Sequence, residues 1–332
     1  MSGLTYKEAG VDIEEEDEAI SALRDSVLFA REGLGSPFES EFAGLVEFGE
    51  FALSLCTDGV GTKLIVANKM EKWDTIGIDC IAMNVNDAIC QGAEPIAFVD
   101  YLAFEDPDPE LARQLGKGLQ KGAELANVTI VGGETATLKE IIDGFDIAGT
   151  ALGYVKKKDV IDGSEVESGD KIIGLPSSGI HSNGLTLARK IVDESEHDYE
   201  DESDFGVIGE ELLEPTKIYV DTVMEALEKY EIKGMANITG GGLRNIPRIN
   251  RDFRYVIDNP LKPQPIFEFL KREGDVSDQE MYQTFNMGMG FALVVSEKLA
   301  DDAAEDLGGK VVGRVEKGSG IILEGKDIEF EL

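Results

Sequence analysis

Residues 51–63 read FALSLCTDGVGTK, which indicates a strand that runs into a glycine-rich loop. The first six residues alternate large and small side chains, as is typical of a half-buried β-strand. Gly59 and Gly61 let the backbone approach a ligand, Asp58 offers a carboxylate to a metal ion, and Lys63 offers a cation to phosphate. The order of residues is not that of a P-loop. The stretch therefore indicates a ligand loop of another kind, or a hairpin turn with incidental charges.

The rest of the chain predicts an α/β (α+β) protein of two domains, because 332 residues exceed what one hydrophobic core usually supports. The polar stretch 156–170 has the composition of a hinge. We expect an arm at 1–50, a first domain at 51–160 with a mixed sheet and helices on one face, and a second α/β domain at 161–332 with glycine-rich loops. Helices are expected at 19–30, 75–91, 109–126, 183–192, 215–230, 241–249 and 297–307, and the first domain's strands at 51–56, 95–104, 128–131 and 145–155.

The composition excludes several classes of partner. The formal net charge is −35 and the pI about 4.3, so the surface repels nucleic acid and anionic membranes. We therefore expect no nucleic-acid and no membrane partner. Three scattered cysteines without C-x-x-C spacing predict buried, reduced thiols. No signal peptide or membrane-spanning run is evident, so a cytoplasmic location is expected.

Three acidic positions beside glycine or at the end of a helix suggest a site for hard cations. Asp87 is expected near the C-terminus of helix 75–91, where the helix dipole disfavours an anion unless a metal ion is near. Glu134 is expected on a tight glycine turn, Gly132-Gly133-Glu134-Thr135, after a short strand. Asp58, Asp87 and Glu134 together would supply oxygen ligands to cations that bridge ATP phosphates. The alternative is that the acids on helix 75–91 lie on a solvated face.

A serine- and glycine-rich loop at 176–184 suggests an anion site in the second domain. The loop follows a predicted strand and opens a helix, so free backbone amides and serine hydroxyls would face a phosphate group. His181 lies inside the loop and is either structural or functional. Two further glycine turns, at 239–242 and 286–290, are either ligand loops or tight strand–helix connections. The candidate substrate-binding residues are Ser177, Ser178, Gly179, Ser182, Asn183, Gly184, Thr239, Gly240 and Gly241.

Taken in order, these segments resemble the aminoimidazole ribonucleotide synthetase family. The resemblance covers nearly the whole chain and begins at residues 6–13. Its motifs are DGVGTK at 58–63, VND at 85–87, QGAEP at 91–95, GGET at 132–135, SSGIHSNG at 177–184, LEPTKIY at 213–219, TGGG at 239–242, NIPR at 245–248 and MYQTFNMG at 281–288.

The resemblance implies two α/β domains, a homodimer whose N-terminal sheets join, ATP and Mg²⁺ as cofactors, and a need for a monovalent cation such as K⁺ in some members. It implies ATP-dependent cyclisation of formylglycinamidine ribonucleotide. The candidate catalytic residues are Asp58, Lys63, Asp87 and His181. The candidate nucleotide contacts are Thr57, Gly59, Gly61, Thr62, Asn86, Gly132, Gly133, Glu134 and Thr135, with Asp58, Asp87 and Glu134 as metal ligands.

The sequence departs from the family in places that concern the nucleotide pocket. Residues 36–45 are poor in glycine, residues 137–140 lack the family's usual stretch, and a basic residue associated with ATP falls at Arg24. The alternatives are related phosphoryl-transfer enzymes, namely selenophosphate synthetase, thiamine-monophosphate kinase or a hydrogenase-maturation protein, or a non-catalytic ligand-binding relative. The cysteines that two of these enzymes need are absent from the expected positions, since no Cys precedes Cys56 and the chain ends EFEL.

Overall fold

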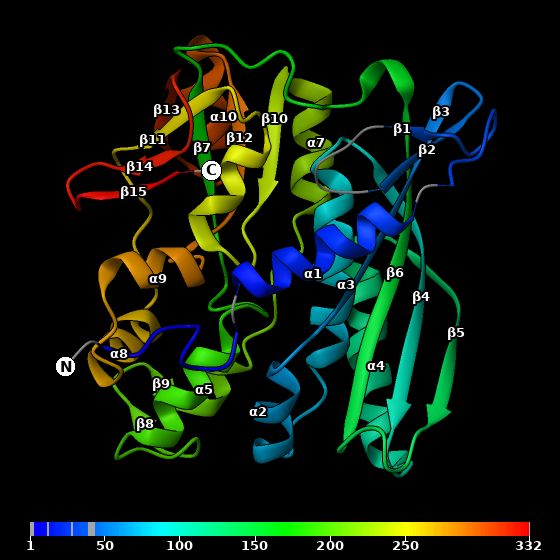
Figure 1. Ribbon diagram of the computed structural model, residues 1–332, viewed down its shortest axis with the longest axis vertical. Coiled ribbons are helices and arrows are strands. Elements are labelled where there is room, and N and C mark those ends of the chain that lie inside the picture. Colours follow the sequence, from blue (N-terminus) through cyan, green and yellow to red (C-terminus); the bar gives the residue numbers. More distant parts are fainter. Residues whose placement is uncertain (1–2, 12, 28, 39–43, 332) are drawn as a thin grey trace.

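The computed structural model describes residues 3–11, 13–27, 29–38 and 44–331. The side chain of Arg24 and residues 39–43 of the glycine-poor stretch lie outside this description. Two sheets, each with helices against it, stand side by side (Figure 1). The elements of the first half are α1 (Ile13–Ser26), β1 (Pro37–Phe38), β2 (Gly44–Phe48), β3 (Phe51–Gly59), α2 (Lys63–Met70), α3 (Ile76–Ile89), β4 (Glu94–Phe104), α4 (Pro109–Ala126), β5 (Thr129–Thr137) and β6 (Phe145–Lys156).

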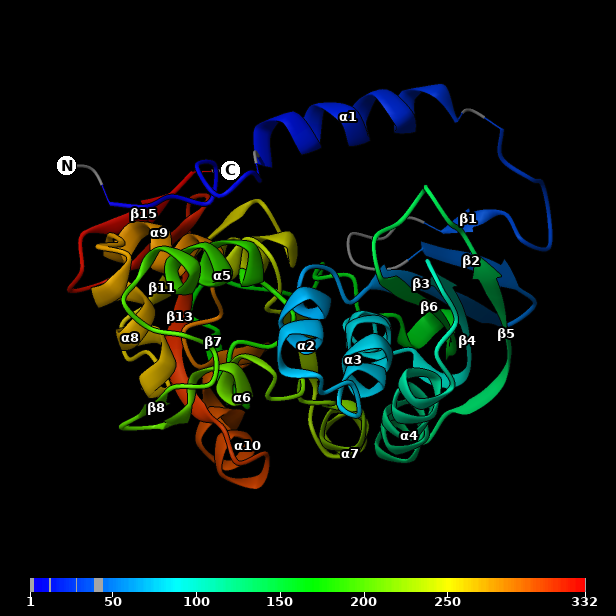
Figure 2. The ribbon, with the colours of Figure 1, turned by 90° about the horizontal axis from the view of Figure 1, so that it is seen from below.

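The first sheet has the strand order β1-β2-β3-β6-β4-β5. Its neighbours pair antiparallel except β4 and β5, which run parallel. Helices α3 and α4 cover one face of this sheet (Figure 2), as the sequence predicted. The opposite face carries exposed apolar side chains, including Leu55, Val99, Tyr101 and Val131. Strands β1 and β2 belong to this sheet, although the sequence placed them in a separate arm.

The second sheet has the order β10-β12-β7-β13-β11-β14-β15. Strand β12 is buried along its whole length and lies between β10 and β7. The elements of this half are η1 (Lys157–Asp159), β7 (Lys171–Pro176), α5 (Leu185–Glu194), β8 (Glu202–Ser203), β9 (Gly206–Val207), α6 (Ile208–Leu212), α7 (Val220–Lys229), β10 (Ile232–Asn237), η2 (Gly242–Arg248), β11 (Phe253–Ile257), α8 (Pro265–Glu273), α9 (Asp278–Thr284), β12 (Met289–Val295), η3 (Glu297–Leu299), α10 (Ala300–Asp306), β13 (Lys310–Lys317), β14 (Ile321–Leu323) and β15 (Ile328–Phe330).

Helix α3 lies at the junction of the two halves. Twelve of its residues are buried, since the first sheet, α4 and α7 all pack against it. Buried apolar residues of both halves form one continuous cluster. The extended residues 214–219, here called the interdomain segment, run alongside α3 before α7 begins. The two domains therefore meet through a packed interface, which fixes their relative position.

Several predicted elements differ from the structure. The helix predicted at 215–230 begins only at Val220, because the amides of Thr216 and Tyr219 donate to side chains of α3. The strand predicted at 128–131 continues to Thr137, so the motif 132–135 is strand and not a tight turn. The helix predicted at 19–30 spans Ile13–Ser26, and the one at 241–249 is a 3₁₀ helix. The prediction of buried free cysteines is confirmed. In the described part of the chain, no helix is long and apolar enough to cross a membrane.

Candidate active site

Asp58 lies at the end of β3, on the face of the sheet that α3 covers. Its Oδ1 accepts a hydrogen bond from Gly59 N at 2.7 Å. Asn84 of α3 donates to the Asp58 carbonyl at 3.2 Å, which ties the strand end to the helix. Burial raises the pKa of the Asp58 carboxyl above its ordinary value. A bound cation would stabilise the ionised form of a carboxylate whose pKa is raised in this way.

Asp87 lies in the last turn of α3 and faces the second domain. Its Oδ1 accepts a hydrogen bond from Asn237 Nδ2 at 2.8 Å. Burial raises the pKa of Asp87 to about 6, and the nearby Asp58 charge adds to this, whereas Asn237 and Arg248 oppose it. The sequence predicted Asp58, Asp87 and Glu134 in one cation site; of these, Asp58 lies near enough to Asp87 for its charge to act on it.

Glu134 does not join this pair within one chain. Gly59, Ala148, Tyr101 and Glu134 form a row across four neighbouring strands. Three strand spacings of roughly 4.8 Å separate Glu134 from the end of β3 by about 14 Å. Within the described ranges, no three His, Cys, Asp or Glu residues are grouped to hold a metal ion. The predicted three-carboxylate site is therefore wrong for a single chain, and the other members of the motif, Gly132, Gly133 and Thr135, lie on β5 with Glu134.

Lys63 is not on an open surface, contrary to the predicted phosphate contact. Its side chain and that of Asp79 are 0% exposed, and Lys63 Nζ lies 2.9 Å from Asp79 Oδ1. Nζ also donates to the Glu214 carbonyl at 2.7 Å. Burial lowers the pKa of Lys63, while Asp79 opposes that shift. The lysine therefore joins α2 to α3 and to the interdomain segment.

The serine hydroxyls of loop 176–184 bind protein atoms, contrary to the predicted phosphate contacts. Ser177 Oγ donates to Asn286 Oδ1 at 3.0 Å, and Ser178 Oγ donates to the Pro215 carbonyl at 2.6 Å. Ser182 Oγ donates to Asp79 at 3.1 Å. The Gly179 carbonyl accepts from Asn286 Nδ2, and a Cβ on Gly184 would clash with Phe285. This loop is thus packed against both domains.

His181, within this loop, is buried and has a left-handed backbone with φ of 61°. Its Nε2 accepts hydrogen bonds from Ser178 N at 3.3 Å and Lys217 N at 3.4 Å. Burial, and then the charges of Lys63 and Lys217, lower the pKa of His181 to about 3. The imidazole is therefore neutral at pH 7, and its acceptor nitrogen is occupied. Proton transfer, which sequence analysis considered for it, does not fit this geometry.

Two other predicted nucleotide contacts have structural partners. Asn86 Nδ2 donates to the Lys217 carbonyl at 2.8 Å, and Asn86 Oδ1 accepts from Tyr219 N at 3.0 Å. The nitrogen and the oxygen of the Asn86 side-chain amide thus both bind the interdomain segment. Thr57 Oγ1 donates to the Gly149 carbonyl at 2.9 Å, across the first sheet.

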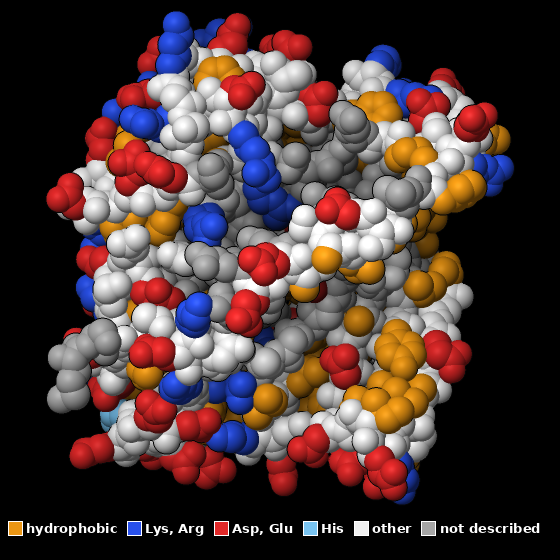
Figure 3. Space-filling model, viewed as in Figure 1, with side chains coloured by type: hydrophobic (Ala, Val, Ile, Leu, Met, Phe, Trp, Pro, Cys, Tyr) orange, Lys and Arg blue, Asp and Glu red, His pale blue; other side chains and the backbone are white. Residues whose placement is uncertain are grey.

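Gly240, in the turn 239–241, is exposed, so this part of the predicted site is open to solvent. A Cβ on Gly240 would lie 3.4 Å from Asn183 Oδ1, so the turn 239–241 borders the end of loop 176–184. Gly241 has φ of 97°, a conformation that suits glycine. Thr62, after the glycines 59 and 61, meets Thr186 of α5 with the hydroxyl oxygens 2.9 Å apart. Lys and Arg side chains border the hollow between the two halves in Figure 3.

Four residues of the junction were not among the candidates from sequence, namely Asp79, Thr216, Asn237 and Arg248. In the sequence, Asp79 was only one of the acids of helix 75–91 that a solvated helix face would explain. Thr216 and Arg248 lie within motifs at 213–219 and 245–248 that were noted without a role. For Asn237, the sequence carries no signal besides its place at the end of a strand.

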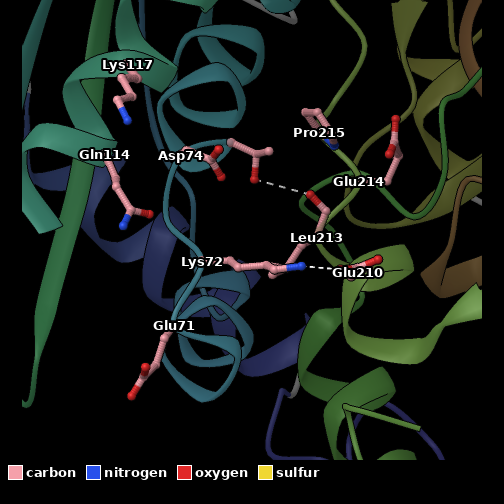
Figure 4. A pocket seen from close by; sticks show the side chains of 10 residues that line it. Glu71, Lys72, Asp74, Gln114, Lys117, Glu210, Leu213, Glu214 and Pro215 are labelled. Carbon is pink, nitrogen blue, oxygen red and sulfur yellow. Dashed lines mark hydrogen bonds and ion pairs between the residues drawn. The ribbon is translucent and has the colours of Figure 1, made fainter. Parts of the chain in front are cut away.

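A pocket of about 550 Å³ opens near the other end of α3 (Figure 4). At roughly 1.5 Å per residue along the helix, Thr75 lies about 18 Å from Asp87, so this pocket is separate from the carboxylate pair. The ion pair of Lys72 with Glu210 spans its mouth. Thr75 Oγ1 donates to the Leu213 carbonyl at 3.4 Å. The residues that line this pocket are Glu71, Lys72, Asp74, Thr75, Gln114, Lys117, Glu210, Leu213, Glu214 and Pro215.

Comparison with protein families agrees with the two-domain division of the fold. Residues 40–155 match the N-terminal domain of AIR synthase related proteins, and residues 167–326 match their C-terminal domain. A phosphoribosylformylglycinamidine cyclo-ligase of Methanosarcina mazei is 52% identical over 333 residues, covering 99% of this chain and 98% of that protein. One of Methanocaldococcus jannaschii is 51% identical over 323 residues, covering 94% and 92%. The chain belongs to the phosphoribosylformylglycinamidine cyclo-ligase family.

Solved structures share the fold at much lower identity. A thiamine-monophosphate kinase from Stenotrophomonas maltophilia has a TM-score of 0.64 and 16% identity, covering 96% of this chain and 97% of that chain. A hydrogenase maturation protein HypE in complex with ATP has a TM-score of 0.65 and 16% identity, covering 97% and 95%. These similarities concern the fold alone, whereas the cyclo-ligases match in sequence from end to end.

Proposed function

We propose that this protein closes the imidazole ring of aminoimidazole ribonucleotide from formylglycinamidine ribonucleotide, with conversion of ATP to ADP and phosphate. The observation that carries the proposal is the 52% identity to a cyclo-ligase over 99% of the chain. The carboxylate pair of Asp58 and Asp87, facing Asn237 of the second domain, is consistent with it.

The proposed chemistry needs ATP because an amide-like oxygen is a poor leaving group. The formyl oxygen attacks the γ-phosphorus of ATP, the bond to ADP breaks, and the oxygen becomes part of a phosphate ester. The amidine nitrogen then attacks the formyl carbon, and phosphate departs with the original formyl oxygen. Positioning and charge stabilisation account for most of the catalysis of such transfers.

The residues at the carboxylate pair fit a Mg²⁺ ion. Asp58 and Asp87 offer carboxylate oxygens, and burial raises the pKa of both carboxyls, so a bound cation would stabilise their ionised forms. When bound, the ion would supply charge neutralisation to the phosphates of ATP. In the second domain, the turn 239–241, Asn183 and the amides at the start of α5 are the proposed substrate contacts, since the serine hydroxyls are already paired.

We also propose that the protein is a homodimer that joins through the outer face of the first sheet. Apolar side chains gather over this part of the surface (Figure 3), and Val131 is 65% exposed and Tyr101 42% exposed. Exposed apolar patches of this kind commonly mark protein interfaces. A monomer in sedimentation equilibrium at micromolar concentration would contradict this proposal. The cytoplasmic location expected from the sequence stays a prediction, and recovery with membranes on cell fractionation would count against it.

The proposed function predicts which substrate triggers ATP consumption. Purified protein should release ADP when Mg²⁺ and formylglycinamidine ribonucleotide are both present. Release should be at least about a hundredfold slower when one of the two is left out. Thiamine monophosphate and selenide, tested at equal concentration, serve as the comparison substrates. ATP consumption that follows either of these and ignores the amidine would rule out the proposed reaction.

A further inference from the structure

One carboxylate oxygen collects donors from both domains at the centre of the molecule. Asp79 Oδ1 accepts from Lys63 Nζ at 2.9 Å, Thr216 N at 2.7 Å and Thr216 Oγ1 at 2.6 Å. Ser182 Oγ donates to the same oxygen at 3.1 Å. The other oxygen, Oδ2, is buried and has no hydrogen-bond partner among the described residues. All of these bonds therefore depend on one atom of one fully buried side chain.

The donors connect the two parts of the candidate active site. Lys63 is the first residue of α2 and comes directly after the glycine loop 59–62 of the first domain. Ser182 comes just before Asn183, which borders the proposed substrate turn. Thr216 lies in the interdomain segment, which Asn86 also holds, through Lys217 and Tyr219. Asp79 is thus hydrogen-bonded both to Lys63, which follows the proposed nucleotide loop, and to Ser182, which precedes the proposed substrate contacts.

We propose that Asp79 is a positioning residue that sets the distance between the nucleotide loop of the first domain and the substrate site of the second. This inference rests on the proposed function, in which each domain holds one of the two reactants. Asp79 is 0% exposed and is therefore enclosed by protein, away from surfaces that bind a reactant. Its loss should leave each binding surface intact but misalign them, and a shift of about 1 Å between reacting groups can cost on the order of a hundredfold in rate.

The test compares kcat with KM in Asp79→Asn, which keeps the side-chain shape and removes the charge. We expect kcat to fall at least about tenfold, while KM for ATP and for formylglycinamidine ribonucleotide each stay within about threefold of wild type. Thr216→Val removes only one hydroxyl donor and should produce a smaller loss of kcat with the same constancy of KM. This variant keeps the test valid if Asp79→Asn folds poorly.

Asp170→Asn is the matched control. Asp170 is also buried and paired, with Lys233 Nζ 3.0 Å from its Oδ1, but its partners lie within the second domain. This variant should lower the free energy of unfolding and leave kcat unchanged at a temperature where all the variants are folded.

Wild-type kcat in folded Asp79→Asn, or a raised KM with unchanged kcat, would overturn the inference. An equal loss of kcat in Asp170→Asn would also overturn it, because a general loss of stability would then explain the effect. If the wild-type protein forms no aminoimidazole product, the proposed function itself fails, and this inference fails with it.

Discussion

Lys63→Met should lower the free energy of unfolding by about 3–5 kcal/mol, because it leaves the Asp79 carboxylate buried without its cation. Both side chains of this pair are 0% exposed, so water cannot replace the lost partner. The Glu214 carbonyl also loses its donor, which weakens the attachment of the interdomain segment. Urea unfolding, monitored by the fluorescence of Trp73, would measure the change.

Lys69→Met is a matched control on the same helix. Lys69 pairs with Asp193 across the domains, but the two side chains are 43% and 42% exposed. An exposed pair contributes only about 0–1 kcal/mol, so this variant should unfold nearly as the wild type does. If Lys63→Met instead keeps wild-type stability and loses ATP binding, Lys63 contacts phosphate, as first predicted from the sequence.

Asp87→Asn should reduce turnover at least about tenfold, equivalent to ~1.4 kcal/mol of activation free energy, without destabilising the fold. The amide oxygen of asparagine can still accept the hydrogen bond from Asn237. The folded-state pKa of Asp87, about 6, lies above its ordinary value, so ionisation penalises the folded protein at pH 7. Removing the charge should therefore leave the free energy of unfolding unchanged or higher, while the proposed Mg²⁺ ion loses a ligand.

Glu134→Gln provides the comparison for Asp87→Asn. Glu134 lies about three strand spacings, roughly 14 Å, from the end of β3 within one chain. Measuring turnover at increasing Mg²⁺ concentrations would show whether either variant weakens Mg²⁺ binding. Unchanged turnover of Asp87→Asn at limiting Mg²⁺ would remove Asp87 from the proposed metal site. A loss in Glu134→Gln as large as that in Asp87→Asn would mean that Glu134 reaches the metal in the assembled enzyme.

Local pattern was enough to predict elements whose partners are close in the sequence. The helix predicted at 109–126 matches α4 residue for residue. For α4, Asp108 caps the first turn and Pro109 follows, which are signals that the sequence itself displays.

Long-range hydrogen bonds account for the main errors. Pro215 suggested the first turn of a helix, but the amides of Thr216 and Tyr219 donate to Asp79 and Asn86, more than 130 positions away along the chain. The position of Lys63 beside a glycine loop also suggested a phosphate contact. The structure pairs Lys63 with Asp79 instead, and this pairing depends on how α2 packs on α3. Charge and glycine content predicted ligand-binding loops at 57–63 and 176–184. They could not predict which side chains there face a ligand and which pair with other side chains of the protein.

The most direct test of the proposed reaction follows the formyl oxygen of formylglycinamidine ribonucleotide labelled with ¹⁸O. The proposed mechanism transfers this oxygen to the γ-phosphorus of ATP before the ring closes, and the phosphate then departs with it. We expect one ¹⁸O atom in each phosphate released and one aminoimidazole ribonucleotide formed for each ADP. Label found in water, with unlabelled phosphate, would mean that ATP does not activate the formyl oxygen and would contradict the proposed reaction.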